Sequence, residues 1–445
     1  MKKYIPLLLL CTGVTTITAA EKPNFVILFV DDLGWADLGY QNTKFDTPNI
    51  NQLKDDGIYY SRTYVSTATS SPSRASLLTG REALRCGFVR HIYDVEDPSA
   101  PREEFQTLST DPAHMKSRAW LPLEEITYAE RLKEMGYYNM FVGKWHLGHE
   151  PYYPTKQGFD AMYGTCEHGH PRNYYAPFFK TEDPFPNARE GEDYLTNMLT
   201  DGAVNFITEY DKQQPFLLNM WYYGVHGPQH GRRDLIAKYE SRGMNHIDAV
   251  QAAMIEAIDE SVGRVRETLE RCDMADNTVI IFSSDQGGAF SNAPLSGGKK
   301  GGNTLADGGS RVPMIIYNPM ASSNGVSYDK AVETLDIYPT LVEMASNKKC
   351  KDRQIQGVSL VPTFNGKELK DRDLFLHRSY EDQNSAIVRG DYKLIKYRSG
   401  KLELFDLKND VGESTNLVDA KPKLRDQMLT ALTKWQEEAT PKELY

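Results

Sequence analysis

Two continuous apolar runs, each followed by acidic residues, limit most strongly what this chain can fold into. The runs are Asn24–Val30 (NFVILFV) and Thr278–Ser283 (TVIIFS), and they precede the pair Asp31-Asp32 and Asp285. Uninterrupted apolar runs of this length are typical of strands buried on both faces of a helix-covered sheet. Ligands of such sheets bind beyond the carboxyl ends of the strands. We therefore expect the three carboxylates to meet at one edge of a sheet.

Apolar strands alternate with amphipathic helices along the first three quarters of the chain. We expect further strands at 137–142, 216–223 and 312–317, and helices at 127–136 and 249–272. This alternation predicts an α/β fold with a large, mostly parallel sheet flanked by helices.

The pattern changes after about residue 348. Short alternating strands at 386–388, 392–396 and 402–406 precede a closing helix at 422–438. They indicate a small antiparallel sheet with one helix. We therefore expect a main domain over 21–348 and a C-terminal subdomain over 349–445.

The first twenty residues have the layout of a signal peptide. Lys2 and Lys3 precede an apolar run at 5–10, and small residues at 18–20 precede Glu21. Such a segment is too short to span a membrane with these flanks, and no later segment is long and apolar enough. We expect a periplasmic or secreted protein. Export permits disulfides, but the spacing of the later cysteines leaves open whether they pair or stay free thiols: Cys86, Cys166, Cys272, Cys350.

The charge balance argues against one large class of partners. The chain has 51 basic and 61 acidic residues, a formal net charge of -10. Nucleic-acid-binding proteins normally carry a basic surface, so we expect no nucleic-acid partner. A small anionic substrate is compatible with this charge, because a metal and a few local cations can dominate the field inside a site.

The acids at the strand ends point to a bound cation. Three carboxylates that converge without a cation repel one another. A hard cation with oxygen ligands removes the repulsion, and Gln286 offers a further amide oxygen. For the pair Asp31-Asp32 taken alone, a helix cap or a turn is the alternative interpretation, and for either acid taken singly it is the better one.

The segment from Ser70 to Arg81 (SSPSRASLLTGR) carries the most specific signal. Pro72 and the helix-favouring residues after it place Ser70 at a helix N-terminus, where backbone N–H groups and the dipole favour anions. Ser70 and Arg74 are four residues apart and so share one helix face. A plain cap serine with a solvated arginine is the alternative.

This segment resembles the signature of the formylglycine-dependent sulfatases, a cysteine or serine followed by x-P-S-R and then L-T-G-R. The match is of the serine type found in bacterial carbohydrate sulfatases. Further segments are similar to motifs of that family in the same order: 143–148 (GKWHLG), 226–228 (HGP), 284–288 (SDQGG, with Gln286 for asparagine), 294–299 and 308–313. The resemblance implies an alkaline-phosphatase-like superfold and a sulfuric ester hydrolase.

The resemblance also implies roles for these residues. Calcium would be held by Asp31, Asp32, Asp285 and Gln286. Ser70 would be oxidised by a sulfatase-maturing enzyme to formylglycine (3-oxoalanine), whose hydrate is the nucleophile. The other expected catalytic residues position the sulfate, protonate the leaving sugar oxygen or accept a proton: Arg74, Lys144, His146, His226, Lys299.

The expected substrate is a sulfated mono- or oligosaccharide, attacked from its end. Polar and cationic residues suited to sugars and anions are candidates for binding it: Arg90, His91, His168, His170, Arg172, Lys300. The sequence leaves open which sugar is recognised and whether Lys299 or Lys300 contacts the sulfate. Two other functions compete: a phosphoester hydrolase of the same superfold that uses unmodified Ser70, and a non-catalytic glycan-binding protein.

Overall fold

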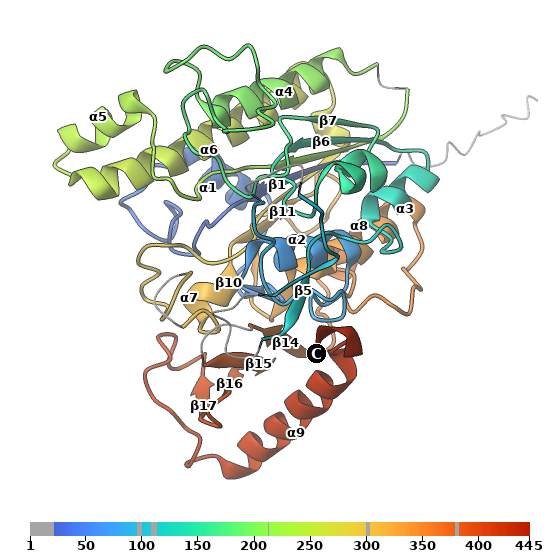
Figure 1. The fold of residues 1–445 in the computed structure, drawn as a ribbon, viewed down its shortest axis with the longest axis vertical. Coiled ribbons are helices and arrows are strands. Elements are labelled where there is room, and N and C mark those ends of the chain that lie inside the picture. Colours follow the sequence, from blue (N-terminus) through green and yellow to red (C-terminus); the bar gives the residue numbers. More distant parts are fainter. Residues whose placement is uncertain (1–21, 96–99, 108–113, 212, 300–302, 379–381) are drawn as a thin grey trace, which may run out of the picture.

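The computed structural model describes residues 22–95, 100–107, 114–211, 213–299, 303–378 and 382–445 (Figure 1). The expected signal peptide and Lys300 lie outside these residues. The helices of eight or more residues are α1 Pro48–Asp56, α2 Ser70–Thr79, α4 Leu195–Glu209, α5 Arg233–Ser241, α6 His246–Arg271, α8 Ile337–Ser346 and α9 Pro422–Ala439; α3 Tyr128–Glu134 and α7 Asp307–Ser310 are shorter.

Within the described ranges, the largest sheet has eight strands in the order β12-β2-β11-β9-β1-β8-β6-β7. Their bounds are β1 Asn24–Val30, β2 Ile58–Tyr60, β6 Tyr138–Gly143, β7 Ala161–Tyr163, β8 Phe216–Trp221, β9 Thr278–Ser284, β11 Met314–Tyr317 and β12 Val326–Tyr328. β11 runs antiparallel to both of its neighbours, and the other pairings are parallel. The sheet is therefore mixed and mostly parallel, as the alternation of strands and helices predicts.

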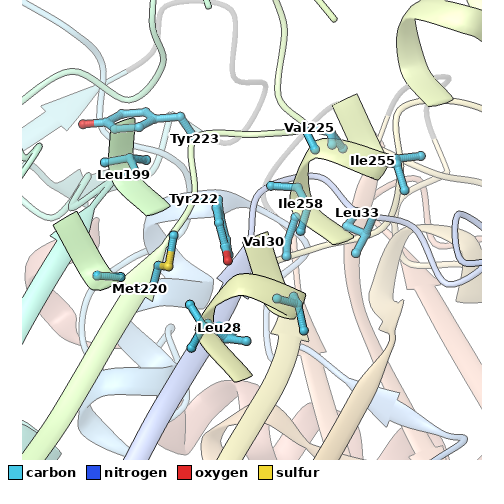
Figure 2. Packing of buried hydrophobic residues seen from close by; sticks show 14 of the residues in the cluster. Leu28, Val30, Leu33, Leu199, Met220, Tyr222, Tyr223, Val225, Ile255 and Ile258 are labelled. Atoms are coloured by element: carbon cyan, nitrogen blue, oxygen red, sulfur yellow. The ribbon is translucent and has the colours of Figure 1, made fainter. Parts of the chain in front are cut away.

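Helices cover both faces of this sheet (Figure 1). Residues of α1, α4, α5 and α6 pack on one face, and residues of α2, α3 and α8 pack on the other. Alternate residues of β1 serve the two faces: Leu28 and Val30 belong to the first core, and Ile27 and Phe29 to the second. Figure 2 shows Ile258 of α6 close to Val30 in the first core. Burial on both faces explains the uninterrupted apolar sequence of the strand.

The prediction of a single strand at 312–317 is wrong, because this segment belongs to two strands in different sheets. Residues Arg311–Val312 form β10, which pairs with β3 (Thr63–Tyr64) in a separate sheet with β13 (Val332–Glu333), whereas β11 begins at Met314. Pro313 lies between them and has no backbone N–H to donate to a ladder. The chain therefore changes sheets at this proline.

The C-terminal part forms a second, antiparallel sheet of four strands, covered by α9 (Figure 1). The strands are β14 Asp373–His377, β15 Gln383–Arg389, β16 Tyr392–Tyr397 and β17 Leu402–Asp406, in sequential order. A two-stranded sheet is formed by β4 Phe105–Thr107 and β5 Lys116–Arg118, and Phe105 packs against the core of the C-terminal sheet and α9. The boundary at residue 348 stays a prediction.

A buried ionic cluster joins the C-terminal sheet to the main body. The fully buried Lys393 of β16 contacts carboxylate oxygens of Asp307 at 2.5 Å and Glu413 at 2.9 Å. Glu413 also accepts hydrogen bonds from the Asp307 backbone N–H at 2.7 Å and from Ser296 Oγ at 2.8 Å. The cluster thus holds both ends of the segment that carries Lys299.

The described cysteines form no disulfide: Cys86, Cys166, Cys272 and Cys350 are free. None of the helices in the described part of the chain combines the length and apolarity that a membrane crossing requires.

Candidate active site

The acidic residues after β1 and β9 meet at the carboxyl edge of the large sheet. The two strands pair in parallel, with Val30 beside Ser284. Carboxylate oxygens of Asp31, Asp32 and Asp285 consequently lie within 4.8 Å of one another, and all three side chains are buried. The strand register alone brings together residues that are separated by more than 250 positions.

Three cations surround these carboxylates. Arg74 Nη2 lies 3.0 Å from Asp285 Oδ2 and 3.6 Å from Asp31 Oδ1. Lys144 Nζ donates to Asp31 Oδ2 at 2.5 Å, and Lys299 Nζ donates to Asp32 Oδ2. Burial alone would raise the pKa of Asp31, but Lys144 and its other cationic neighbours hold it below the usual value. Among the described residues, these three cations balance the three carboxylates, so a bound dication would give the site a net positive charge, which suits an anionic ligand.

Ser70 is the first residue of α2, and its side chain is buried at the helix N-terminus. Arg74, one turn along the helix, donates a hydrogen bond from Nε to Ser70 Oγ at 3.0 Å. His146 Nδ1 lies 3.3 Å from the same oxygen. A reactive group at position 70 would therefore lie between a fixed cation and an imidazole, beside N–H groups that favour anions.

His146 is held as a neutral base. It follows β6, and its Nε2 lies 2.9 Å from the backbone oxygen of Ile92. A carbonyl oxygen only accepts, so Nε2 carries the proton and Nδ1 presents a lone pair to Ser70. Burial, followed by the charge of Lys144, lowers the pKa of His146 well below its usual value. The imidazole can therefore accept a proton from a hydroxyl at position 70.

His226 approaches the carboxylates from the segment after β8. Its Nε2 lies 3.9 Å from Asp32 Oδ2, and its Nδ1 donates to the backbone oxygen of Gly227 at 2.7 Å. The ring of His170 stacks on it, with centroids 5.4 Å apart and planes inclined by 6°. Burial lowers the pKa of His226, and the charge of Asp32 partly offsets this effect. The stacked ring and the carbonyl fix its Nε2 toward the site.

The donors around the acidic cluster suit a hard cation. All are oxygen donors, the ligands that calcium prefers. Asp31 Oδ1 is buried and has no hydrogen-bond partner among the described residues. Gln286 donates from Nε2 to Asp32 Oδ1 at 2.8 Å. Its amide oxygen would serve as a ligand after a half-turn of the terminal torsion. The residues therefore fit a calcium ion.

A cleft of about 550 Å³ opens above Ser70, His146, His226, Gln286 and Lys299. Of the expected substrate-binding residues, His91 and His170 line it, whereas Arg90, His168 and Arg172 do not. The fully buried Arg90 donates to the backbone oxygens of Met115 and Gln106. His168 hydrogen-bonds with Thr181, and Arg172 is exposed elsewhere. Direct substrate contact is therefore not supported for these three.

Sequence reasoning missed several residues that line the cleft. Arg378, just after β14, donates hydrogen bonds to the backbone oxygen of Ala68 and to Thr69 Oγ1. Asp94 accepts a hydrogen bond from the Gly169 N–H at 3.0 Å. Neither belongs to a motif, and Arg378 comes from a different sheet, so only the three-dimensional fold identifies them.

Comparisons with known proteins agree with this geometry. A family model described as "Sulfatase" matches residues 23–347, and one described as "N-sulphoglucosamine sulphohydrolase, C-terminal" matches residues 304–438. The chain is 32% identical over 413 residues to the N-acetylgalactosamine-6-sulfatase of Mus musculus, an alignment that covers 87% of this chain and 74% of that one. It is 30% identical to a sulfatase of Formosa agariphila, with coverage of 93% and 88%.

Among solved structures, the chain is similar to Ps i-CgsB in complex with k-i-k-neocarrahexaose. The TM-score is 0.80 at 28% identity, and the match covers 96% of this chain and 95% of the other. The putative sulfatase yidJ from Bacteroides fragilis has the same fold, with a TM-score of 0.73 at 20% identity and coverage of 97% and 99%.

Proposed function

The chain belongs to the sulfatase family of sulfuric ester hydrolases, and from this premise we propose that it removes sulfate from a sugar, with Ser70 as the precursor of its nucleophile. The observation that carries the proposal is the position of Ser70 Oγ, at a helix N-terminus between Arg74 Nε and His146 Nδ1. The carbohydrate nature of the substrate is supported by the relatives. One is named for N-acetylgalactosamine 6-sulfate, and another binds a neocarrahexaose.

The cations of the site answer the first difficulty of sulfate ester hydrolysis, the negative charge that repels a nucleophile. Arg74, Lys144 and Lys299 occupy fixed positions before substrate arrives, where electrostatic stabilisation is most effective. A calcium ion held by Asp31, Asp32, Asp285 and Gln286 would neutralise charge on the sulfate oxygens. We propose calcium because the donor set is entirely oxygen.

His226 and Lys299 address the second difficulty, which is that the sugar alkoxide is a poor leaving group. Both line the cleft on the side of Asp32, where Lys299 Nζ donates to the carboxylate. Burial works against the charged form of Lys299, but Asp32 and Asp31 raise its pKa, so this amine remains protonated. Because its Nδ1–H is held by the Gly227 carbonyl, His226 can donate from Nε2 only as the imidazolium. We propose that the negative charge of the bound substrate, added to that of Asp32, favours this protonated form, which then delivers the Nε2 proton to the departing sugar oxygen while Lys299 keeps the oxygens of the sulfate in place.

We propose that His146 accepts a proton from the group at position 70 when sulfate is released. Its Nδ1 lone pair faces Oγ, and its other nitrogen is held by the Ile92 carbonyl, so it can accept a proton from that side only. Oxidised to formylglycine and hydrated, residue 70 would supply two hydroxyl groups, one for attack and one for release of sulfate. That modification requires a maturing enzyme that oxidises serine. We also propose that the protein works in the periplasm or outside the cell.

Two measurements test the proposed function. A panel of sulfated sugars, with matching phosphates, should show sulfate release only. Mass spectrometry of the active protein should show residue 70 lighter by two hydrogens than serine, or the corresponding hydrate. Ser70→Ala should bind a sulfated sugar without hydrolysing it. Active protein with plain serine at position 70, or faster phosphate release, would favour direct phosphoester hydrolysis by Ser70 instead. Wild-type protein that binds but never hydrolyses would indicate a glycan-binding protein.

A further inference from the structure

A second cleft, of about 490 Å³, adjoins the catalytic one. The two share the segment Ile92–Asp94 as a common wall. That segment touches the catalytic machinery, because the Ile92 backbone oxygen accepts the hydrogen bond from His146 Nε2. The two clefts are therefore neighbours, with this segment lining both. The volume of the second cleft lies in the usual range for small-molecule sites.

An immobilised aromatic ring lines the second cleft. Trp120 is half-buried, and one face of its indole stacks on Tyr152, with centroids 4.7 Å apart and planes inclined by 13°. His149 packs edge-on against it, with centroids 5.5 Å apart. A ring held in this way loses little further freedom when a ligand binds. Its apolar surface suits the C–H face of a sugar ring, which is flat and weakly apolar.

Fixed hydrogen-bonding groups lie in the same cleft. Arg102 Nη2 contacts both carboxylate oxygens of Glu167, at 3.0 and 3.1 Å, and the side chains are only 19% and 7% exposed. Arg102 Nε is buried and has no hydrogen-bond partner within the described residues. An oriented donor and acceptor pair beside an aromatic ring provides the few well-placed polar groups that a ligand site needs.

The charge of the cleft discriminates between kinds of sugar. Among the described lining residues, Asp94, Glu103 and Glu167 oppose the single cation Arg102. Burial lowers the pKa of His149, so this imidazole adds little positive charge near neutral pH. A second anionic group would therefore meet net repulsion here, in contrast to the catalytic cleft. The lining favours a neutral, hydroxyl-rich ring.

We propose that the second cleft is a sugar subsite, which binds a neutral sugar residue adjacent to the sulfated one. This inference rests on the proposed function, since the sulfated residue occupies the catalytic cleft. The enzyme accordingly uses free sulfated monosaccharides less efficiently than oligosaccharides.

The experiment compares three substrates built on the sulfated sugar that the panel identifies. The sugar is offered alone, linked to galactose, and linked to glucuronic acid, with para-nitrophenyl sulfate as a substrate that lacks a second sugar. For the wild-type enzyme, kcat/KM should be highest for the galactose-linked substrate, by about tenfold over the monosaccharide. Trp120→Ala should remove this advantage through KM and leave para-nitrophenyl sulfate turnover unchanged, and Trp120→Phe should restore most of it.

A second variant keeps the test valid if Trp120→Ala does not fold. Glu103 is exposed at the rim of the cleft, and Glu103→Lys should shift the preference toward the glucuronic acid-linked substrate. Equal kcat/KM for the monosaccharide and both disaccharides, unaltered by either variant, would overturn the subsite. Failure of the proposed function looks different: the wild-type enzyme would then hydrolyse no sugar sulfate at all.

Discussion

Replacement of Gly169 by alanine should displace the His146 imidazole without changing the chemical identity of any catalytic side chain. Gly169 lies against the imidazole, and an added Cβ would be 2.5 Å from Nε2 and 2.6 Å from Cε1. The backbone of Gly169 does not require glycine for its conformation, because its φ lies outside the left-handed region. The substitution therefore acts through packing against one catalytic ring.

The size of the effect follows from this overlap. Ordinary contact begins at 3.4 Å, so the ring or the loop must move by about 0.9 Å. His146 cannot make such a move and keep both its 2.9 Å contact with Ile92 and its 3.3 Å contact with Ser70. A misplacement of about 1 Å costs about 100-fold in rate, which corresponds to about 2.7 kcal/mol in activation free energy. Overpacking should also lower the free energy of unfolding by about 1–3 kcal/mol.

The assay measures kcat and KM of the matured enzyme on a sugar sulfate. In Gly169→Ala, kcat should fall about 100-fold while KM changes little, because the ring acts on position 70 and not on the sugar. The decisive control is a double-mutant cycle with His146→Ala. If Gly169→Ala acts through the imidazole, it should add almost nothing in that background. A kcat within about threefold of wild type, or an equal loss in both backgrounds, would refute the steric argument.

Three further predictions concern the metal, the leaving group and acid stability. Asp285→Asn keeps the side-chain oxygen that accepts a hydrogen bond from the Asp32 N–H, but it removes a negative charge. It should therefore weaken calcium binding, measured by calorimetry, and reduce turnover at least about 100-fold. Full activity after chelation would contradict the metal site. His226→Ala should slow hydrolysis of sugar sulfates about 100-fold or more, but aryl sulfates much less, since phenolates depart without a proton; equal losses would indicate a binding role. Burial lowers the pKa of His377 from 6.5 to about 3, so the folded state binds fewer protons than the unfolded state between these values. The stability that neutral His377 contributes is fully present above pH 6.5, and below it the free energy of unfolding falls by up to about 1.4 kcal/mol per pH unit. In urea unfolding, His377→Gln should lose less stability per pH unit on acidification than wild type. An identical dependence of the free energy of unfolding on pH would exclude this histidine as the cause.

The parts of the fold that depend on apolar continuity could be predicted from the sequence. β1 begins and ends at the expected residues, and β9 differs from the expected strand by one residue. Their burial on both faces is a property of the residues themselves, and the parallel register then places the acids together. The same reasoning failed at Pro313, because an apolar run does not reveal a change of sheet.

The catalytic groups within motifs could also be located, whereas the surrounding cleft could not. Ser70 and Arg74 interact at the spacing of one helical turn, which the sequence indicates directly. Arg378 and Asp94 reach the cleft from a separate sheet and from an irregular loop, and no local pattern records such a contact. Arg90 is adjacent to a lining residue in sequence, but its side chain points into the protein and binds backbone oxygens. Proximity along the chain is therefore a poor guide to substrate contact.

The buried cluster around Lys393 affects how freely the two parts of the chain can be recombined. Because Glu413 holds the Ser296 hydroxyl and the Asp307 backbone, a C-terminal sheet taken from a relative would also have to reproduce this ionic lock. A chimera that lacks it would leave a lysine or a carboxylate buried without a partner, an error far more costly than a poorly matched surface. The C-terminal sheet and the segment that carries Lys299 should therefore change together in evolution. Substrate specificity should then diversify more readily through changes in loops than through exchange of the C-terminal sheet.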